Sequence, residues 1–160
     1  MTRVGCTGHQ GITASTRRAV SAAIAQTLAD LENGLEGLSS LAEGSDQVFA
    51  LAVLAAGGKL HVVIPSRGYE ETFAADIPRA TYRALVALAQ QHTTLPFTEP
   101  GEDAYLAAGQ HIVDHSDVLL AVWDGQDAAG KGGTGDVVAY AYDRGLDVRV
   151  IWPRNARRSA

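Results

Sequence analysis

VLLAVWDGQDAAGKGGTGDVVAYAY, residues 118–142, joins a continuous apolar run to a glycine-rich loop and then to a segment with helical spacing. A buried strand that turns through glycines into a helix is typical of α/β proteins that bind phosphate. Glycines let the main chain approach an anion, and the first helical turn offers unpaired N–H groups and a positive dipole end. We therefore expect a phosphorylated ligand to rest on the amides of residues 132–136.

The rest of the 160-residue chain alternates short apolar runs with helical patterns. Strands are predicted over residues 3–7, 37–42, 60–64, 118–123 and 148–152, with helices between them. Strands separated by helices pair in parallel through right-handed crossovers, and continuous apolar character predicts burial on both faces. The predicted fold class is α/β: a doubly wound, mainly parallel, Rossmann-like sheet of about five to six strands with helices on both faces.

The domain organisation is predicted to be simple. Residues 1–153 form one domain, and residues 154–160 form a basic, flexible C-terminal tail. Residues 93–100 hold two prolines and are interpreted as irregular or as a brief strand. In a sheet of this kind, ligands bind beyond the carboxyl ends of the strands. The loops at residues 7–11, 43–46 and 125–136 should therefore meet, with residues 66–69 beside them.

Several segments resemble a known superfamily. Residues 38–50, followed by residues 55–65 with Gly57-Gly58, are similar to the corresponding segment of DNA-processing protein A and its relatives. The apolar strand, Asp124 and residues 132–135 resemble the glycine loop of the cytokinin-activating Lonely Guy enzymes, and residues 4–9 resemble an opening with a Gly-His turn. Together they resemble the SLOG superfamily of Rossmann-like proteins over nearly the whole chain. The resemblance implies a nucleotide or a nucleotide-derived ligand.

Catalysis is less well supported than binding. Some members of the superfamily hydrolyse nucleotide N-glycosidic bonds with a glutamate three residues after the loop threonine. Here Val137 stands at that distance from Thr134, and Asp136 comes one residue early, which rotates it by about 100° on a helix. Glu43, at a predicted strand end, is the other candidate carboxylate. We expect a binding module; the alternative is a nucleotide N-glycosidase that uses Glu43 or Asp136.

The predicted ligand contacts come from the glycine turns and the loop beside them. They are Gly5, Thr7, Gly8, His9, Glu43, Gly44, Ser45, Asp46, Arg67, Tyr69, Lys131, Gly132, Gly133, Thr134, Gly135 and Asp136. Each polar member has a plainer alternative. His9 stabilises its turn, Asp46 and Asp136 cap helices, and Lys131 faces solvent. Arg67 and Tyr69 belong to a surface loop without a ligand.

The amino-acid composition limits the kinds of binding partner and the cellular compartment that we expect. The formal charge is −5 and the isoelectric point about 5.4, so we expect no nucleic-acid partner. The single cysteine, Cys6, excludes an internal disulfide, and no apolar run has the length of a membrane span. His111 and His115 lack a third metal ligand, so no metal site and no required cofactor are expected. We expect a cytoplasmic protein with no membrane partner, which the family resemblance suggests is a homodimer.

Overall fold

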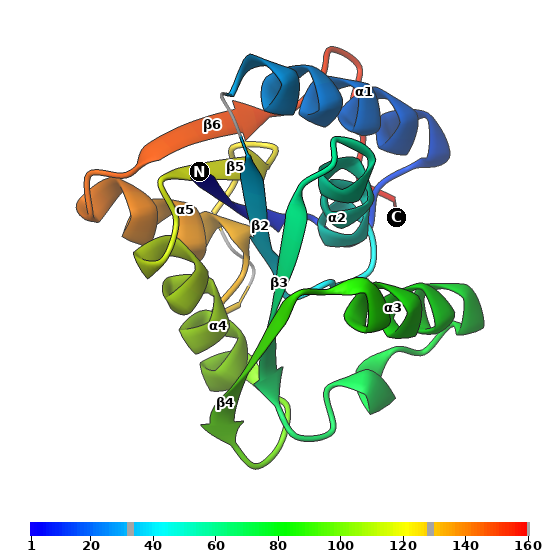
Figure 1. The fold of residues 1–160 in the computed structure, drawn as a ribbon, viewed down its shortest axis with the longest axis vertical. Coiled ribbons are helices and arrows are strands. Elements are labelled where there is room, and N and C mark those ends of the chain that lie inside the picture. Colours follow the sequence, from blue (N-terminus) through cyan, green and yellow to red (C-terminus); the bar gives the residue numbers. More distant parts are fainter. Residues whose placement is uncertain (32–33, 128–129, 160) are drawn as a thin grey trace.

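The computed structural model describes residues 1–31, 34–127 and 130–159. Its described strands form one parallel sheet in the order β4-β3-β2-β1-β5-β6 (Figure 1). The strands are β1 (Thr2–Gly8), β2 (Leu35–Ser39), β3 (Lys59–Ser66), β4 (Gln91–Phe97), β5 (Val118–Val122) and β6 (Asp147–Ile151). The strand order reverses between β1 and β5, so the chain leaves the centre of the sheet in both directions from this point. The predicted doubly wound, Rossmann-like fold is confirmed.

Helices cover both faces of the sheet. They are α1 (Ala14–Asp30), α2 (Ser45–Ala55), α3 (Asp76–Leu88), α4 (Glu102–Asp114) and α5 (Thr134–Asp143), with a short 3-10 turn at Glu70–Thr72. In Figure 1, α1, α2 and α3 lie on one side of the sheet and α4 and α5 on the other. Among the described residues, no helix combines the length and the apolar character that crossing a membrane requires.

The pattern of burial in β5 explains why helices pack on both faces of the sheet. All five of its residues are buried, without the alternation of a half-exposed strand. Leu120 packs in a cluster with Ile24 of α1 and Phe49 of α2, whereas its neighbour Leu119 packs in a second cluster with Ile112 of α4. Successive side chains of a strand point to opposite faces, so an unbroken apolar run serves both cores.

Most of residues 93–100, for which the sequence predicts either irregular structure or a brief strand, belong to strand β4. Residues 91–97 form an edge strand that pairs in parallel with β3, and the register shifts between Ile64 and Ser66. A proline has no N–H to donate to a neighbouring strand. Pro96 is tolerated because β4 is an edge strand, where an N–H that faces away from the sheet or lies in a bulge has no strand partner to lose.

The C-terminal segment (residues 153–159) is held against the start of α1, where we expected a flexible tail. Thr13 N donates to Arg157 O at 3.2 Å, and Ser159 N donates to Gly11 O at 3.1 Å. These two bonds flank an isolated antiparallel bridge between Ile12 and Arg158. Arg157 N also donates to Thr16 Oγ1 at 2.7 Å. Backbone pairing therefore returns the end of the chain to the first βα turn; Ala160 lies outside the described residues.

Candidate functional site

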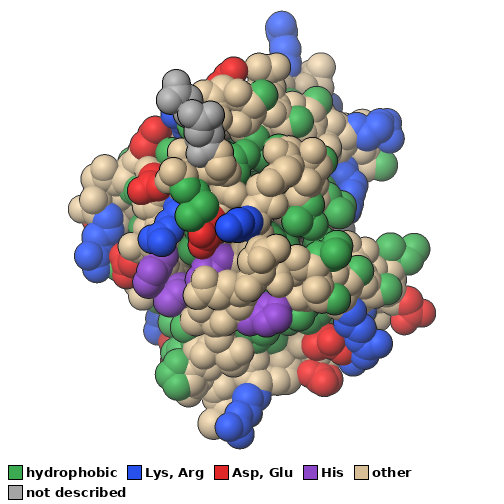
Figure 2. Space-filling model, in the orientation of Figure 1, with side chains coloured by type: hydrophobic (Ala, Val, Ile, Leu, Met, Phe, Trp, Pro, Cys, Tyr) green, Lys and Arg blue, Asp and Glu red, His purple; other side chains and the backbone are tan. Residues whose placement is uncertain are grey.

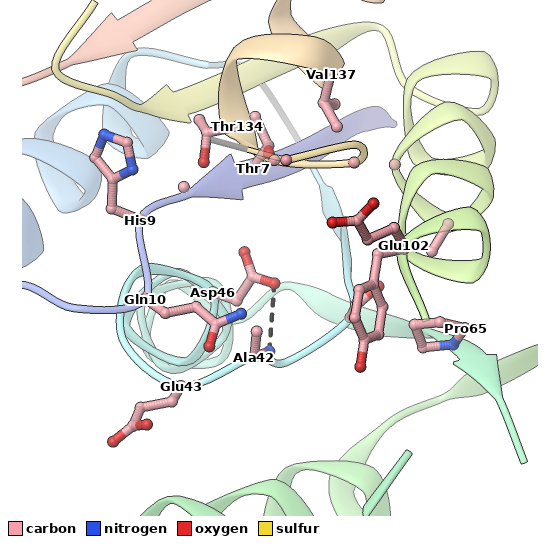
Figure 3. Close-up of a pocket in the computed structure, with 18 of the residues that line it drawn as sticks. Thr7, His9, Gln10, Ala42, Glu43, Asp46, Pro65, Glu102, Thr134 and Val137 are labelled. Atoms are coloured by element: carbon pink, nitrogen blue, oxygen red, sulfur yellow. Dashed lines mark hydrogen bonds between the residues drawn. The ribbon is translucent and has the colours of Figure 1, made fainter. Parts of the chain in front are cut away.

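A cleft of about 780 Å³ opens at the carboxyl ends of the strands (Figure 3). Its walls come from the turns after β1, β2, β3 and β5, from one side of α4, and from Arg158. The reversal of strand order between β1 and β5 places the cleft at the switch point of the sheet, where open α/β sheets bind ligands. The volume is in the range of small-molecule sites. The three turns selected from the sequence therefore lie together at one rim.

Most, but not all, of the predicted contacts line this cleft. Those that do are Thr7, Gly8, His9, Glu43, Asp46, Tyr69, Lys131, Gly132, Gly133, Thr134 and Gly135. Gly5, Gly44, Ser45, Arg67 and Asp136 are outside the lining. Gly5 lies within β1, where a Cβ would come within 2.6 Å of the Ile112 and Ser116 side chains. Its glycine is therefore explained by the packing of α4 on the sheet.

Gly44 and Ser45 join two turns instead of facing the cleft. Gly44 has a φ of 88°, and a Cβ there would lie 2.0 Å from Gln10 O. The Ser45 hydroxyl donates to His9 O at 2.6 Å, and Ser45 N donates to the same oxygen at 3.2 Å. The turn after β2 is therefore bonded to the turn after β1. Arg67 is exposed on the loop after β3 and does not reach the cleft.

The expected anion-binding loop is partly occupied by its own acidic residue. Asp136 Oδ2 accepts from Gly132 N at 3.0 Å. Gly133 N donates to Gly130 O, and Asp136 N donates to Gly133 O. The prediction that all amides of residues 132–136 receive the ligand is therefore wrong. Thr134 N and Gly135 N, in the first turn of α5, donate to no residue that the structure describes.

Lys131 is engaged by an acidic partner on α4. Its Nζ lies 2.5 Å from Asp103 Oδ1, and both side chains are more than half exposed. The bond from the Asp103 carboxylate raises the pKa of Lys131, so the ammonium stays charged. Exposed pairs of this kind contribute little to stability. The contact nevertheless directs the lysine toward α4.

His9 is buried and bridges two strand ends. Its Nε2 lies 3.1 Å from both the main-chain N and the Oδ1 of Asp124, the second residue after β5. Burial is the main cause of its lowered pKa, and the nearby Arg158 adds to it. The ring also packs edge-on against Trp152, with centroids 5.5 Å apart. These contacts favour the turn-stabilising interpretation of His9.

Asp46 is the buried carboxyl group at the floor of the cleft. The N-cap of α2 is Gly44, and Asp46 lies in the first turn, where its Oδ2 accepts from Ala42 N at 3.3 Å. Its side chain is 8% exposed, and burial raises its pKa to about 7. Burial and the neighbouring Asp46 also raise the pKa of the Cys6 thiol. The thiol is therefore an inert packing group, as its position in β1 suggests.

The two candidate catalytic carboxylates are either directed away from the cleft or hydrogen-bonded within their own loop. Glu43 is exposed, and Figure 3 shows its side chain directed away from the cleft. Asp136 is bonded to the loop amide, and Val137, at the position of the family's glutamate, is buried. Figure 3 instead shows Gln10, Asp46 and Glu102 directed into the cleft.

Tyr69 belongs to an aromatic cluster. It is 6% exposed, and its ring meets those of Phe73, Tyr82 and Tyr105 edge-on at centroid distances of 5.5, 5.6 and 6.3 Å. These rings form one side wall, from which Tyr69, Phe73 and Tyr105 line the cleft. Tyr69 is a packed wall residue, not a free stacking surface.

Sequence reasoning missed Gln10, Glu102, Tyr105 and Arg158. Gln10 sits inside a predicted turn and was available as a candidate. Glu102 and Tyr105 come from α4, whose approach to the cleft depends on how it packs over the sheet. Arg158 reaches the site only because the C-terminal segment folds back.

Comparisons with known proteins support the fold. No protein-family model and no curated protein matches the chain. Among solved structures, DNA processing protein A of Streptococcus pneumoniae has a TM-score of 0.70 at 23% identity, with 97% of this chain and 52% of that chain covered. The same protein of Helicobacter pylori gives 0.70 at 18% identity, with 96% and 66% covered. The Moco carrier protein of Chlamydomonas rheinhardtii gives 0.55 at 16% identity, with 93% and 74% covered.

One expectation about partners requires correction. The Helicobacter pylori protein is described by its single-stranded DNA binding mode, and it shares this fold. A net charge of −5 is therefore no ground for excluding a nucleic-acid partner for a chain with this fold. The chain spans about half the length of the Streptococcus pneumoniae protein. The predicted resemblance to DNA-processing protein A is confirmed at the level of the fold.

Proposed function

We propose that this chain is a binding module for a nucleotide or a nucleotide-derived small molecule. The observation that carries the proposal is the meeting of the turns after β1, β2 and β5 around one cleft at the switch point. The cleft combines small and polar groups with an aromatic wall, as sites for small molecules and cofactors do. The phosphate rests on the amides of Thr134 and Gly135, and the base or ribose lies between residues 7–10 and residues 43–46.

Thr134 offers a test of the phosphate contact that spares the fold. It is the first residue of α5, its N–H has no partner among the described residues, and the preceding Gly133 is extended at φ −70° and ψ 173°. Proline is favoured at this helical position and requires an extended residue before it. Thr134→Pro therefore deletes one amide donor, whereas Thr134→Ala deletes only the hydroxyl and is the matched control.

The measurement is a thermal-shift screen against AMP, GMP, CMP, UMP, cyclic nucleotides and NAD derivatives, followed by calorimetry. A ligand at about a hundredfold excess over its dissociation constant stabilises by about 2.7 kcal/mol. Loss of a hydrogen bond to a charged group costs about 1.5–3 kcal/mol, so Thr134→Pro should weaken binding by roughly 10- to 100-fold. A wild-type protein that no nucleotide stabilises would refute the proposal.

The same samples address the glycosidase alternative. The positions of Glu43, Asp136 and Val137 favour binding without turnover, so we expect no free base after incubation with nucleoside monophosphates. Release of base that Glu43→Gln abolishes would reverse this order of preference.

A second candidate function, single-stranded DNA binding, is favoured by one surface. Arg17, Arg18, Arg154, Arg157 and Arg158 are exposed, and backbone bonds hold the C-terminal segment against the start of α1. Residues 10–29 and 152–160 contain no acidic side chain. On the face drawn in Figure 2, the Lys and Arg side chains of the described residues instead stand at scattered positions.

Fluorescence anisotropy with a labelled oligothymidylate tests this candidate. Affinity should fall steeply with salt, because bound arginines release counterions from the phosphates. A triple variant (Arg17→Ala, Arg18→Ala, Arg157→Ala) should lower both the affinity and the salt dependence. Arg67→Ala, which removes an exposed arginine elsewhere, is the control. No binding at low salt would remove this candidate.

A further inference from the structure

The N-terminus of α1, where a Rossmann-like fold commonly receives a phosphate, is contacted by the C-terminal segment. Thr13 N donates to Arg157 O, Thr16 N to Thr13 Oγ1 at 3.3 Å, and Arg17 N to Thr13 O at 2.8 Å. A Cβ on Gly11 would meet Ser159 Oγ at 2.6 Å, so the two segments approach closely. None of residues 12–17 lines the cleft, so a phosphate in the cleft must find its contacts elsewhere.

The charges around the cleft do not favour an anion. Its described lining includes the acidic residues Asp46, Glu102 and Asp127, and also Glu43, whose side chain is directed away from the cleft. The Lys and Arg residues in that lining are Lys131 and Arg158. Lys131 is held 2.5 Å from Asp103, whereas the Arg158 guanidinium lies 3.6 Å from Asp124, so Arg158 is the less tightly paired of the two cations.

Arg158 is fixed at its backbone and loosely held at its tip. Hydrogen bonds of Arg157 and Ser159 pin the chain on both sides of it. Its Nη1 lies 3.6 Å from Asp124 Oδ2, beyond hydrogen-bond distance, and its side chain is 52% exposed. Asp124 has other partners, because its Oδ1 accepts from Gln126 N at 3.0 Å and lies 3.1 Å from His9 Nε2. The guanidinium can therefore exchange Asp124 for a ligand at little cost.

We infer that Arg158, carried to the cleft by the C-terminal segment, is the cation that binds the phosphate of a nucleoside monophosphate. The inference rests on the proposed function and names the residue whose positive charge attracts the phosphate. The planar guanidinium donates two parallel bonds to phosphate oxygens, a geometry that a lysine does not reproduce. The C-terminal segment thus supplies a phosphate contact beside the β5–α5 loop.

The experiment compares each nucleoside monophosphate with its own nucleoside, using calorimetry on the full chain. The probes are AMP, GMP, CMP and UMP with adenosine, guanosine, cytidine and uridine. Arg158→Ala should weaken monophosphate binding about 10- to 100-fold and leave nucleoside binding unchanged. Arg158→Lys should recover only part of the loss. Arg154→Ala, in the same segment but outside the cleft lining, should behave as wild type.

The outcomes separate the two proposals. If Arg158→Ala binds monophosphates as tightly as wild type does, the inference is wrong and the binding function stands. Equal loss for nucleoside and monophosphate also overturns the inference, because it indicates a structural role. If wild type binds neither class, both proposals fail. The melting temperature of ligand-free Arg158→Ala should equal that of wild type, because the segment is held by main-chain bonds.

Discussion

Asp46 is the residue at which the site should couple most directly to pH. Its carboxyl is buried, accepts only the Ala42 amide among described backbone groups, and has a pKa raised to about 7 by burial. Below about pH 4 the carboxyl is protonated in both the folded and the unfolded chain. As the pH rises toward 7, the unfolded chain releases the proton and the folded chain keeps it. Stability from this group is therefore lost between about pH 4 and 7.

The variant Asp46→Asn removes the titrating carboxyl but keeps the hydrogen bond, because the amide oxygen still accepts from Ala42 N. Comparison with wild type therefore isolates the pH-dependent part of the stability that Asp46 contributes. We expect wild type to lose up to about 1.4 kcal/mol per pH unit relative to the variant across this window. Urea unfolding at a series of pH values, with the two curves subtracted, measures the difference. A difference that is flat in pH, or that rises with pH, would contradict the assignment.

Gly44 gives a second prediction at the scale of one residue. Both Gly44 and Gly57 have positive φ, but a Cβ on Gly44 would overlap Gln10 O, whereas one on Gly57 meets nothing within 4 Å. Gly57→Ala should therefore cost about 1 kcal/mol from backbone conformation alone. Gly44→Ala should cost clearly more, because the two turns must separate. Denaturant midpoints measure both, and equal costs would show that the turns separate freely.

At the scale of elements, the C-terminal segment should contribute to stability. Removing residues 154–160 deletes the hydrogen bonds that join it to Gly11 O, Thr13 N and Thr16 Oγ1. At about 1 kcal/mol for each, unfolding free energy should fall by about 1–3 kcal/mol. Hydrogen exchange at the Thr13 amide should accelerate in the truncated chain. Unchanged stability and exchange would mean that the segment is detached in solution.

The elements that sequence predicts well are those whose pattern is local. The unbroken apolar run of β5 and the glycines after it define a strand, a turn and a helix start within one stretch. The sequence does not decide between a strand and irregular structure at β4, because prolines weaken a strand pattern and the pattern does not indicate whether the strand lies at an edge of the sheet. The C-terminal segment was missed because an isolated bridge between Ile12 and Arg158 joins residues far apart in the chain.

The site shows the same division. Parallel topology alone brings the turns after β1, β2 and β5 to one rim, so the cleft was predictable. The pairing of Lys131 with Asp103, and of Asp136 with the Gly132 amide, was not, because glycine loops allow many side-chain directions. The sequence pattern therefore identifies which loops meet. The three-dimensional structure is needed to identify which groups of those loops remain available to a ligand.

At the scale of the whole molecule, the two ends of the sheet differ. The carboxyl ends of the strands carry the cleft. Near the amino ends, His61 lies 3.5 Å from Glu36 and bonds Thr93, while His111 and His115 stack with centroids 4.1 Å apart. Figure 2 shows histidines gathered on this face. Among the described residues, no group of three or more His, Cys, Asp or Glu side chains is arranged to hold a metal ion.

Self-association is the prediction that concerns the whole molecule. Leu51 of α2 is 48% exposed, and Ile77 and Leu88 of the neighbouring α3 are 80% and 61% exposed. We expect a homodimer that covers these helices, since a stable interface buries about 1,200 Å² or more around an apolar centre. Sedimentation velocity over a concentration series should give the dimer mass, and the double variant Leu51→Glu, Ile77→Glu should give the monomer. Val150→Glu, an exposed apolar site on β6, should remain dimeric. A monomer at every concentration would contradict the prediction, and dissociation by Val150→Glu alone would move the interface to the β6 edge.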